Sequence, residues 1–333
     1  MLDVIAPGLV TTVQDLGRSG FRHLGVPTGG AGDRDALRVA NVLVGNGEGE
    51  AGLEFTLTGA TMRLRRSRVV ALTGGDCEAR CGGRALPMWR PVAVRAGAEI
   101  EIVRIRRGAR AYLAIGGGIA VPPALGSRST DLRACYGGHE GRALRARDRL
   151  PLGPEHAGHE ALMQRLAAHD VPFVAAPWWV APTEDLRGDV AMLHLLPGKD
   201  VATLDPRVLR QLRDGVWTVG ADSDRMGLRF DGPPIPHGAI AERISEPVLP
   251  GAIQLPPDGR PIVLGVDAQT VGGYPVVGQV IRADMNLAMQ LKPGDRVRPV
   301  LVTLEAAEAA WQVRQRDFAR MREAIAWRSR KVA

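Results

Sequence analysis

Short apolar runs separated by turn residues dominate the chain between residues 51 and 115 and again between residues 190 and 303. The stretch Glu99-Ile-Glu-Ile-Val alternates polar and apolar residues with a period of two, which is typical of a strand with one buried face. Gly, Pro, Asn or Asp bounds most of the runs, and these residues favour tight turns. The pattern predicts strands at 53–57, 68–72, 98–102, 110–115, 190–196, 216–219, 252–255, 261–266 and 297–302.

Three segments have a helical period instead. Residues 33–44 place Leu37, Ala40 and Val44 on one face before a stop at Gly45. A short helix is expected at about 158–168, and a long one over 303–330 with Thr303 as its N-cap. The long helix has one apolar stripe, which predicts that it packs on a core: Leu304, Trp311, Phe318, Met321 and Ile325.

The order of these elements predicts a mainly β protein with a few helices. Strands with such irregular connections do not suit a doubly wound sheet, and two β-barrel-like halves fit them better. Prolines crowd residues 151–189, which we interpret as a linker with one short helix. The predicted organisation is therefore an N-terminal β domain at 1–150, the linker at 151–189, a C-terminal β domain at 190–303 and a terminal helix at 304–333.

Composition sets bounds on the function. The 333 residues are 45% hydrophobic and 24% charged, which is ordinary for a globular protein. The formal net charge is +7, and almost all of the basic residues are arginines. These arginines are interleaved with acids, and aromatic residues for base stacking make up only 4% of the chain. This pattern argues against a nucleic-acid-binding protein and favours a solvated surface with some arginines left for anions.

Several common chemistries lack their motifs. There is no phosphate-binding P-loop and no nucleophile elbow, and Gly116-Gly117-Gly118 leads into prolines that oppose a dinucleotide-binding helix. The histidines and the three cysteines show no metal-ligand spacing, so no metal site is expected. A Met-Lys-Met stretch is absent, so no biotin is expected on this chain. Three cysteines, no leader-like start and no long apolar run predict a cytoplasmic protein without contact with a membrane.

Polar residues beside glycines are the remaining candidates for chemistry. Each such cluster alone is typical of a tight turn. Several of them follow apolar runs, which predicts that loops at one rim bring carboxylates, arginines and bare backbone amides together. The clusters are 11–18, 74–77, 125–130, 222–227, 245–254 and 265–278.

Long stretches of the sequence resemble the biotin-dependent carboxyltransferase family, the group called allophanate hydrolase subunit 2 or KipA, which includes the C subunit of bacterial 5-oxoprolinase. The resemblance covers about residues 4–303. The stretches that carry it are TTVQDLGRSGFRHLGVPTGGAGDRDALRVANVLVGN at 11–46, TGGDCEA at 73–79, YLAIGGGIAVPPALGSRSTDLR at 112–133, SDRMGLRFDG at 223–232 and SEPVLPGAIQLPPDGRPIVLGVDAQTVGGYPVVGQVIRAD at 245–284.

The resemblance implies two cyclophilin-like β-barrel domains and an ATP-dependent cyclic amide hydrolase. The reaction would open 5-oxo-L-proline to L-glutamate, with ATP and Mg²⁺ used in the complex. The implied partners are two further proteins of the complex, one KipI-like and one LamB/YcsF-like. Phosphorylation of the lactam oxygen would activate the carbonyl, and such a step needs cations and amides around phosphate.

On this basis we predict a site from residues of the polar clusters. The predicted catalytic residues are Asp76, Asp267, Gln269, Thr270 and Tyr274. The predicted substrate- or phosphate-binding residues are Gln14, Arg18, Ser127, Arg128, Ser129, Arg225, Gln254, Gly272 and Gly273.

Two other functions fit the same resemblance. The chain could be the carboxyltransferase component of a biotin-dependent urea or amide carboxylase, which would need a biotin carboxylase and a biotin carrier elsewhere. It could also be a KipA-like regulator that binds a KipI-type kinase inhibitor. The polar clusters argue against a purely regulatory protein, because a binding surface does not require them.

Overall fold

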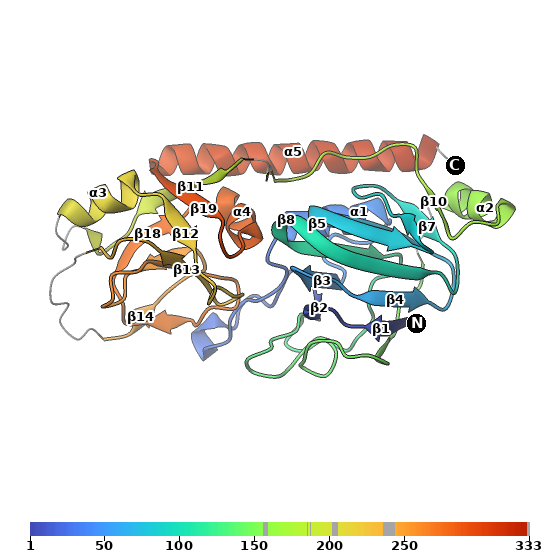
Figure 1. The fold of residues 1–333 in the computed structure, drawn as a ribbon, viewed down its shortest axis with the longest axis horizontal. Coiled ribbons are helices and arrows are strands. Elements are labelled where there is room, and N and C mark those ends of the chain that lie inside the picture. The colour runs from blue at the N-terminus through green and yellow to red at the C-terminus, as the bar shows by residue number, and fades with distance from the viewer. Residues whose placement is uncertain (156–158, 185, 187, 202–205, 236–243, 332–333) are drawn as a thin grey trace. The chain divides into compact units, whose positions relative to one another are not determined.

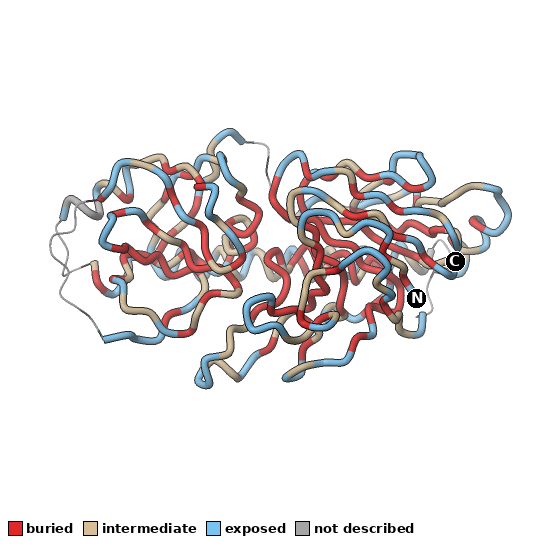
Figure 2. Tube along the Cα trace, turned by 60° about the horizontal axis from the view of Figure 1, so that its bottom comes forward, coloured by how far each residue is buried: buried red, intermediate tan, exposed pale blue. Residues whose placement is uncertain are grey.

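A computed structural model describes residues 1–155, 159–184, 186, 188–201, 206–235 and 244–331. The chain forms two compact units, each with its own core. The first unit comprises Met1–Arg18, Gly29–Asp185 and Asp317–Ala333, and the second comprises Ser19–Thr28 and Leu186–Arg316. Strands predominate in both units (Figure 1), which confirms the prediction of a mainly β protein with a few helices. Buried residues gather in the interior of each unit (Figure 2).

One ten-stranded sheet forms the first unit. The main path through it runs β10-β7-β5-β8-β4-β1-β9, while β2 and β3 branch from β8 and β6 pairs with β5. The strands are β1 (Leu2–Ala6), β2 (Val10–Gln14), β3 (Gly52–Thr56), β4 (Thr61–Leu64), β5 (Arg68–Cys81), β6 (Arg84–Ala85), β7 (Val92–Val94), β8 (Glu99–Ile115), β9 (Arg149–Leu150) and β10 (Phe173–Ala175).

The centre of this sheet is buried on both faces. In β5, Val70 and Leu72 join one hydrophobic core, while Val69 and Ala71 face a second core beneath helix α1 (Arg34–Leu43). Burial on both faces explains why this part of the sequence is a continuous apolar run rather than an alternating one. The helix begins at its N-cap Asp33, whose carboxylate accepts a hydrogen bond from the Ala36 amide at 3.0 Å.

The predicted linker at 151–189 contributes to the first unit. Its short helix α2 (Glu160–Ala168) buries Leu162 and Leu166 in the core that also covers α1. Strand β10 then pairs with β7 and extends the sheet.

The second unit contains a closed barrel, in the half of the chain where the pattern predicts a barrel. Along β11, Leu193 and Leu195 point into its core, while Met192 and His194 lie at least 40% exposed. The barrel strands are β11 (Val190–Pro197), β12 (Trp217–Val219), β13 (Gly227–Asp231), β15 (Ala252–Gln254), β16 (Ile262–Leu264), β18 (Val276–Val280) and β19 (Arg296–Leu301).

Smaller elements complete the second unit. A two-stranded ribbon joins β14 (Glu246–Pro247) to β17 (Val271–Gly272). The helices are η1 (Arg22–Leu24), α3 (Pro206–Asp214), η3 (Arg282–Asp284) and α4 (Met285–Gln290).

The long terminal helix α5 (Leu304–Lys331) contributes to both units, the second up to Arg316 and the first from Asp317. The Thr303 hydroxyl accepts a hydrogen bond from the Ala306 amide at 3.3 Å, as an N-cap does. Of the residues in the predicted apolar stripe, Phe318 and Ile325 are buried, whereas Leu304 is 56% exposed.

Candidate functional site

A buried carboxylate organises the first group of predicted site residues. Asp15 follows β2, and its Oδ1 accepts hydrogen bonds from the hydroxyls of Ser127 and Ser129 at 2.6 Å and from the Gly17 amide at 2.7 Å. Its Oδ2 accepts one from the Arg128 amide at 2.5 Å. The carboxylate is only 6% exposed, so these four donors replace its hydration. Asp15 therefore fastens segment 127–129 to the end of β2, a role that the sequence analysis missed.

Gln14 and Arg18 lie beside this carboxylate. Gln14 donates from Nε2 to the Thr130 carbonyl at 3.2 Å. Arg18 donates from Nη2 to the Ser129 carbonyl at 2.5 Å, and its guanidinium lies 4.6 Å from the ring centre of Tyr136. Both side chains are at most 1% exposed. The structure thus brings four predicted site residues together in the first unit: Gln14, Arg18, Ser127 and Ser129.

The Arg128 side chain takes a different path from its backbone. Its Nε donates to the Val121 carbonyl at 3.0 Å, and its Nη1 lies 3.8 Å from the carboxylate of Glu50. The backbone amide belongs to the Asp15 network, while the guanidinium is already engaged with a carbonyl and a carboxylate.

Asp76 is not at the end of a strand, and that part of the prediction is wrong. It lies within β5, opposite Arg107 of β8, where the register shifts on both sides of it. Such bulges re-aim side chains without ending a strand. Gly74 adopts a positive φ of 94°, and a side chain there would press on the Arg110 carbonyl, which explains the glycine better than an approaching ligand does. The adjacent thiol of Cys77 is buried, and this burial raises its pKa to about 12.

In the second unit, Arg225 and Asp267 form a bidentate ion pair. Arg225 Nε lies 2.6 Å from Asp267 Oδ2, and Nη2 lies 2.9 Å from Oδ1. The two backbones are also joined, because the Asp267 amide donates to the Arg225 carbonyl at 3.1 Å. Each charge compensates the other in a largely buried setting, where a two-pronged contact is strong. The pair connects the loop after β12 to the loop after β16.

Gln254 and the ribbon after β16 form the remaining predicted group. Gln254 is 1% exposed and packs against Gly272, where any side chain would overlap the Gln254 amide. The Thr270 carbonyl accepts from the Val248 amide at 3.0 Å, which fixes the ribbon. Tyr274 is 48% exposed at the end of this segment. The segment also contains Gln269, which is half-buried, and Gly273.

The predicted residues therefore fall into separate groups within the two units. The single cleft that joins them stays a prediction. Asp15, the centre of the first group, was missed because three of its four partners lie more than 110 positions away in the sequence: Ser127, Arg128 and Ser129.

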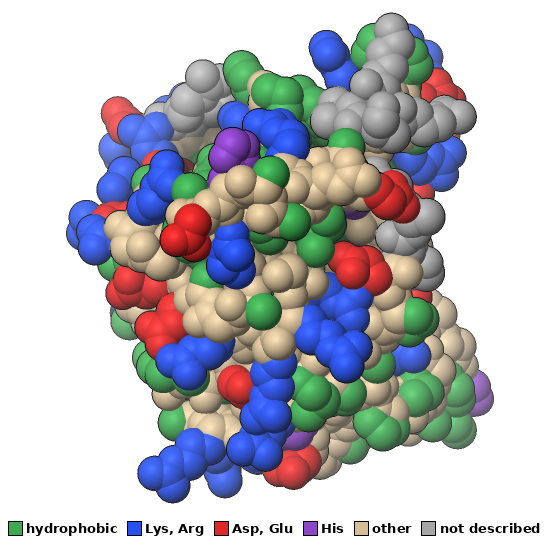
Figure 3. All heavy atoms as spheres, turned by 90° about the vertical axis from the view of Figure 1, so that its right-hand side faces the viewer, with side chains coloured by type: hydrophobic (Ala, Val, Ile, Leu, Met, Phe, Trp, Pro, Cys, Tyr) green, Lys and Arg blue, Asp and Glu red, His purple; other side chains and the backbone are tan. Residues whose placement is uncertain are grey.

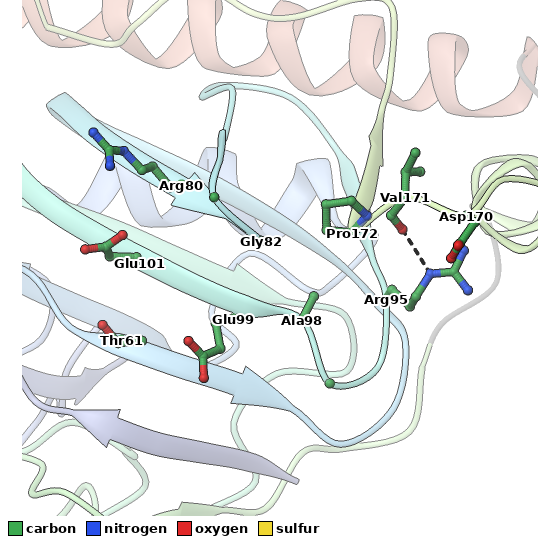
Figure 4. Close-up of a pocket in the computed structure, with 12 residues that line it drawn as sticks. Thr61, Arg80, Gly82, Arg95, Ala98, Glu99, Glu101, Asp170, Val171 and Pro172 are labelled. Carbon is green, nitrogen blue, oxygen red and sulfur yellow. Dashed lines mark hydrogen bonds between the residues drawn. The ribbon is translucent and has the colours of Figure 1, made fainter.

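An open pocket of about 670 Å³ lies elsewhere on the first unit and includes no predicted site residue. Figure 4 shows Arg80, Glu99 and Glu101 on its strand side and Asp170 across from them. Arg95, also in its wall, donates to the Val171 carbonyl at 2.9 Å and so holds the chain after α2. Many basic side chains, with acidic ones scattered between them, lie on this side of the molecule (Figure 3), as expected of a solvated face.

Neither a metal cluster nor a membrane span is found in the described part of the chain. No three His, Cys, Asp or Glu side chains among the residues with described positions could hold a metal ion. None of the helices in that part is long and apolar enough to cross a membrane.

Comparison with known proteins shows the family to which the chain belongs. The chain belongs to the family of the carboxyltransferase domain, subdomains A and B, whose pattern matches residues 24–300. It is 39% identical to the C subunit of 5-oxoprolinase from Escherichia coli (strain K12) over 329 residues, which cover 98% of both chains. It is 33% identical to the corresponding 5-oxoprolinase chain of Haemophilus influenzae, over 92% of this chain and 93% of that one.

A solved structure supports the fold. The K. lactis urea amidolyase matches with a TM-score of 0.83 at 26% identity, over 96% of this chain but 20% of that much longer one. The resemblance read from the sequence is confirmed by these matches.

Proposed function

We propose that the protein is the C subunit of an ATP-dependent 5-oxoprolinase, which opens 5-oxo-L-proline to L-glutamate together with a KipI-like partner and a LamB/YcsF-like partner. The observation that carries this proposal is the 39% identity to the C subunit of a 5-oxoprolinase over 98% of both chains. By contrast, the matching region is a fifth of the urea amidolyase chain. The three cysteines are free, which supports a cytoplasmic location.

The chemistry of the predicted site residues supports the proposal. A lactam resists hydrolysis because resonance protects its carbonyl, and phosphorylation from ATP with Mg²⁺ would make the carbon electrophilic. Such a step needs donors around a phosphate and a group that moves a proton. Asp76, Gln269, Thr270 and Tyr274 remain candidates for these roles. Asp267 can act as a base only after release from Arg225, so we assign that pair to holding the loops.

Reconstitution of the complex tests the proposal. The full chain is combined with its KipI-like and LamB/YcsF-like partners, and L-glutamate is measured with 5-oxo-L-proline in the presence and absence of ATP. We expect glutamate only with ATP and with all three proteins present. Turnover that is unchanged when this chain is omitted would overturn the assignment.

A second candidate is a carboxyltransferase for urea or a related amide. The structural match to the K. lactis urea amidolyase favours it. Its signature is transfer of a carboxyl group from carboxybiotin to urea without the KipI-like and LamB/YcsF-like partners. The same preparation can be assayed for this reaction with a carboxylated biotin carrier, and activity there with none on 5-oxo-L-proline would replace the first proposal.

A further inference from the structure

Arg18 is a fully buried cation whose charge has no acidic partner among the residues with described positions. It is 1% exposed, and its one hydrogen bond is the 2.5 Å contact from Nη2 to the Ser129 carbonyl. Nε and Nη1 have no acceptor in the described part of the chain. Of the five N–H donors of a guanidinium, these two atoms carry three. The Tyr136 ring attracts the charge but cannot accept the in-plane N–H groups.

Gln14 is a buried amide with an unused acceptor. Its Nε2 donates to the Thr12 hydroxyl at 3.0 Å and to the Thr130 carbonyl at 3.2 Å. A carbonyl can only accept, so this contact fixes which end of the amide is nitrogen. Oε1 therefore points away from Thr130, and no donor reaches it from the described residues.

The two side chains bond to consecutive carbonyls of one short segment. Ser129 holds Arg18 and Thr130 holds Gln14, and neighbouring Cα atoms are only about 3.8 Å apart. The Thr130 amide also donates to the Val13 carbonyl at 2.9 Å, which fixes the segment against β2. Two buried side chains with unused polar atoms, a cation with donors and an amide with an acceptor, are thus anchored to neighbouring residues.

Buried polar groups nearly always have partners, and a buried charge without one is costly. A single ligand that satisfied both side chains would offer an anion to Arg18 and a hydrogen-bond donor to Gln14. The phosphates of ATP offer acceptors but no N–H group. A cyclic amide that carries a carboxylate on the carbon beside its ring nitrogen offers both groups on neighbouring atoms.

We propose that Arg18 and Gln14 form a subsite for such a cyclic amino-acid amide, in which Arg18 binds the carboxylate and Gln14 Oε1 accepts the ring N–H. This inference rests on the proposed function and names the part of the first unit that recognises its substrate. Binding in this way leaves the lactam carbonyl, on the other side of the ring nitrogen, free for activation by other groups.

The test uses steady-state kinetics of the reconstituted complex with Arg18→Lys, which keeps the positive charge but loses the planar fork. We expect KM for 5-oxo-L-proline to rise by about 10- to 100-fold, since a hydrogen bond between charged groups contributes that much affinity. KM for ATP should stay within about twofold. Arg95→Lys is the matched control, because Arg95 also bonds to backbone carbonyls but is placed outside the subsite.

Analogues separate recognition from structural support. The wild-type complex should bind 5-oxo-L-proline about 10- to 100-fold more tightly than 2-pyrrolidinone, which lacks the carboxylate, and Arg18→Lys should reduce that preference. The lactone analogue, with oxygen in place of the ring N–H, should bind more weakly because Gln14 then meets no donor. Equal binding of 5-oxo-L-proline and 2-pyrrolidinone by the wild-type complex would exclude the subsite even if the variant fails to fold.

Three results would overturn the inference: equal binding of 5-oxo-L-proline and 2-pyrrolidinone, an unchanged KM for 5-oxo-L-proline in folded Arg18→Lys, or a rise in KM for ATP alone. The second would mean that Arg18 binds only water, and the third that it binds a phosphate. If the wild-type complex does not open 5-oxo-L-proline, the proposed function fails instead. Calorimetry of 5-oxo-L-proline with the wild-type and Arg18→Lys complexes then still decides whether Arg18 binds its carboxylate.

Discussion

Replacing Asp15 by asparagine isolates what its charge contributes, because the two side chains have nearly the same shape. The asparagine can keep one oxygen facing Ser127, Ser129 and Gly17, but these bonds lose their charge assistance and about half their strength. Its amide nitrogen then faces the Arg128 amide, where donor meets donor. An unpaired buried N–H costs about 1–3 kcal/mol, so the total loss should be about 3 kcal/mol.

Calorimetric melting of the full chain measures this loss. For a unit of this size, about 3 kcal/mol lowers the unfolding temperature by roughly 6–12 °C. Asp3→Asn is the control, since Asp3 pairs with an exposed arginine at the surface and its loss should leave the melting temperature close to that of wild type. Melting of Asp15→Asn within about 1 °C of wild type would refute the view that this carboxylate fastens segment 127–129.

Three further outcomes follow from other contacts. Asp267→Ala removes the bidentate carboxylate contact of a largely buried arginine and should destabilise the second unit by about 3 kcal/mol, measured by urea unfolding; an unchanged midpoint would contradict the view that this ion pair holds the two loops. Hydrogen bonds from Arg142 lower the pKa of Asp148 from 3.8 to about 2. The ionised Asp148 therefore stabilises the fold above about pH 4, and this stabilisation is lost as the pH falls towards about 2. Between about pH 5 and 2, the free energy of unfolding of Asp148→Asn should therefore fall by about 1 kcal/mol less than that of wild type. Iodoacetamide at about pH 8 should label exposed Cys135 first and leave Cys77, whose pKa is about 12, unlabelled until unfolding, as mass spectrometry would show.

Local pattern predicted strands that correspond to β3, β5, β8, β11, β12, β15, β16 and β19, and helices that correspond to α1, α2 and α5. It did not locate the other described strands or helix α3, which is as long as α2. It failed where a polar stretch continues a strand: the predicted strands at 98–102 and 110–115 are one strand, β8. Arg104 and Arg106 between them face solvent and bond to Glu78 of the neighbouring β5, so their polarity marks an exposed face rather than a turn. Helix α4 is about one and a half turns long, too short for a helical period to stand out.

The site was harder to predict because its contacts are long-range. Asp15 and Ser129 are separated by 114 positions, and Arg225 and Asp267 by 42. Composition identified the residue types in these clusters, but spacing along the chain carries no information about such pairs. The structure alone distinguishes a carboxylate that is saturated with hydrogen bonds from one that is available for chemistry.

That distinction separates predicted residues that are already paired from predicted residues that are available to bind a ligand. Arg225 and Asp267 are both predicted site residues, yet they pair with each other, and a ligand that recruits either must first break a bidentate ion pair. Arg18 has only a carbonyl and an aromatic face within the described chain, so an anion that reaches it gains a charge-assisted contact without displacing a carboxylate. By this comparison an acidic ligand would gain more at Arg18, in the first unit, than at Arg225, whose ion pair with Asp267 holds loops in the second unit.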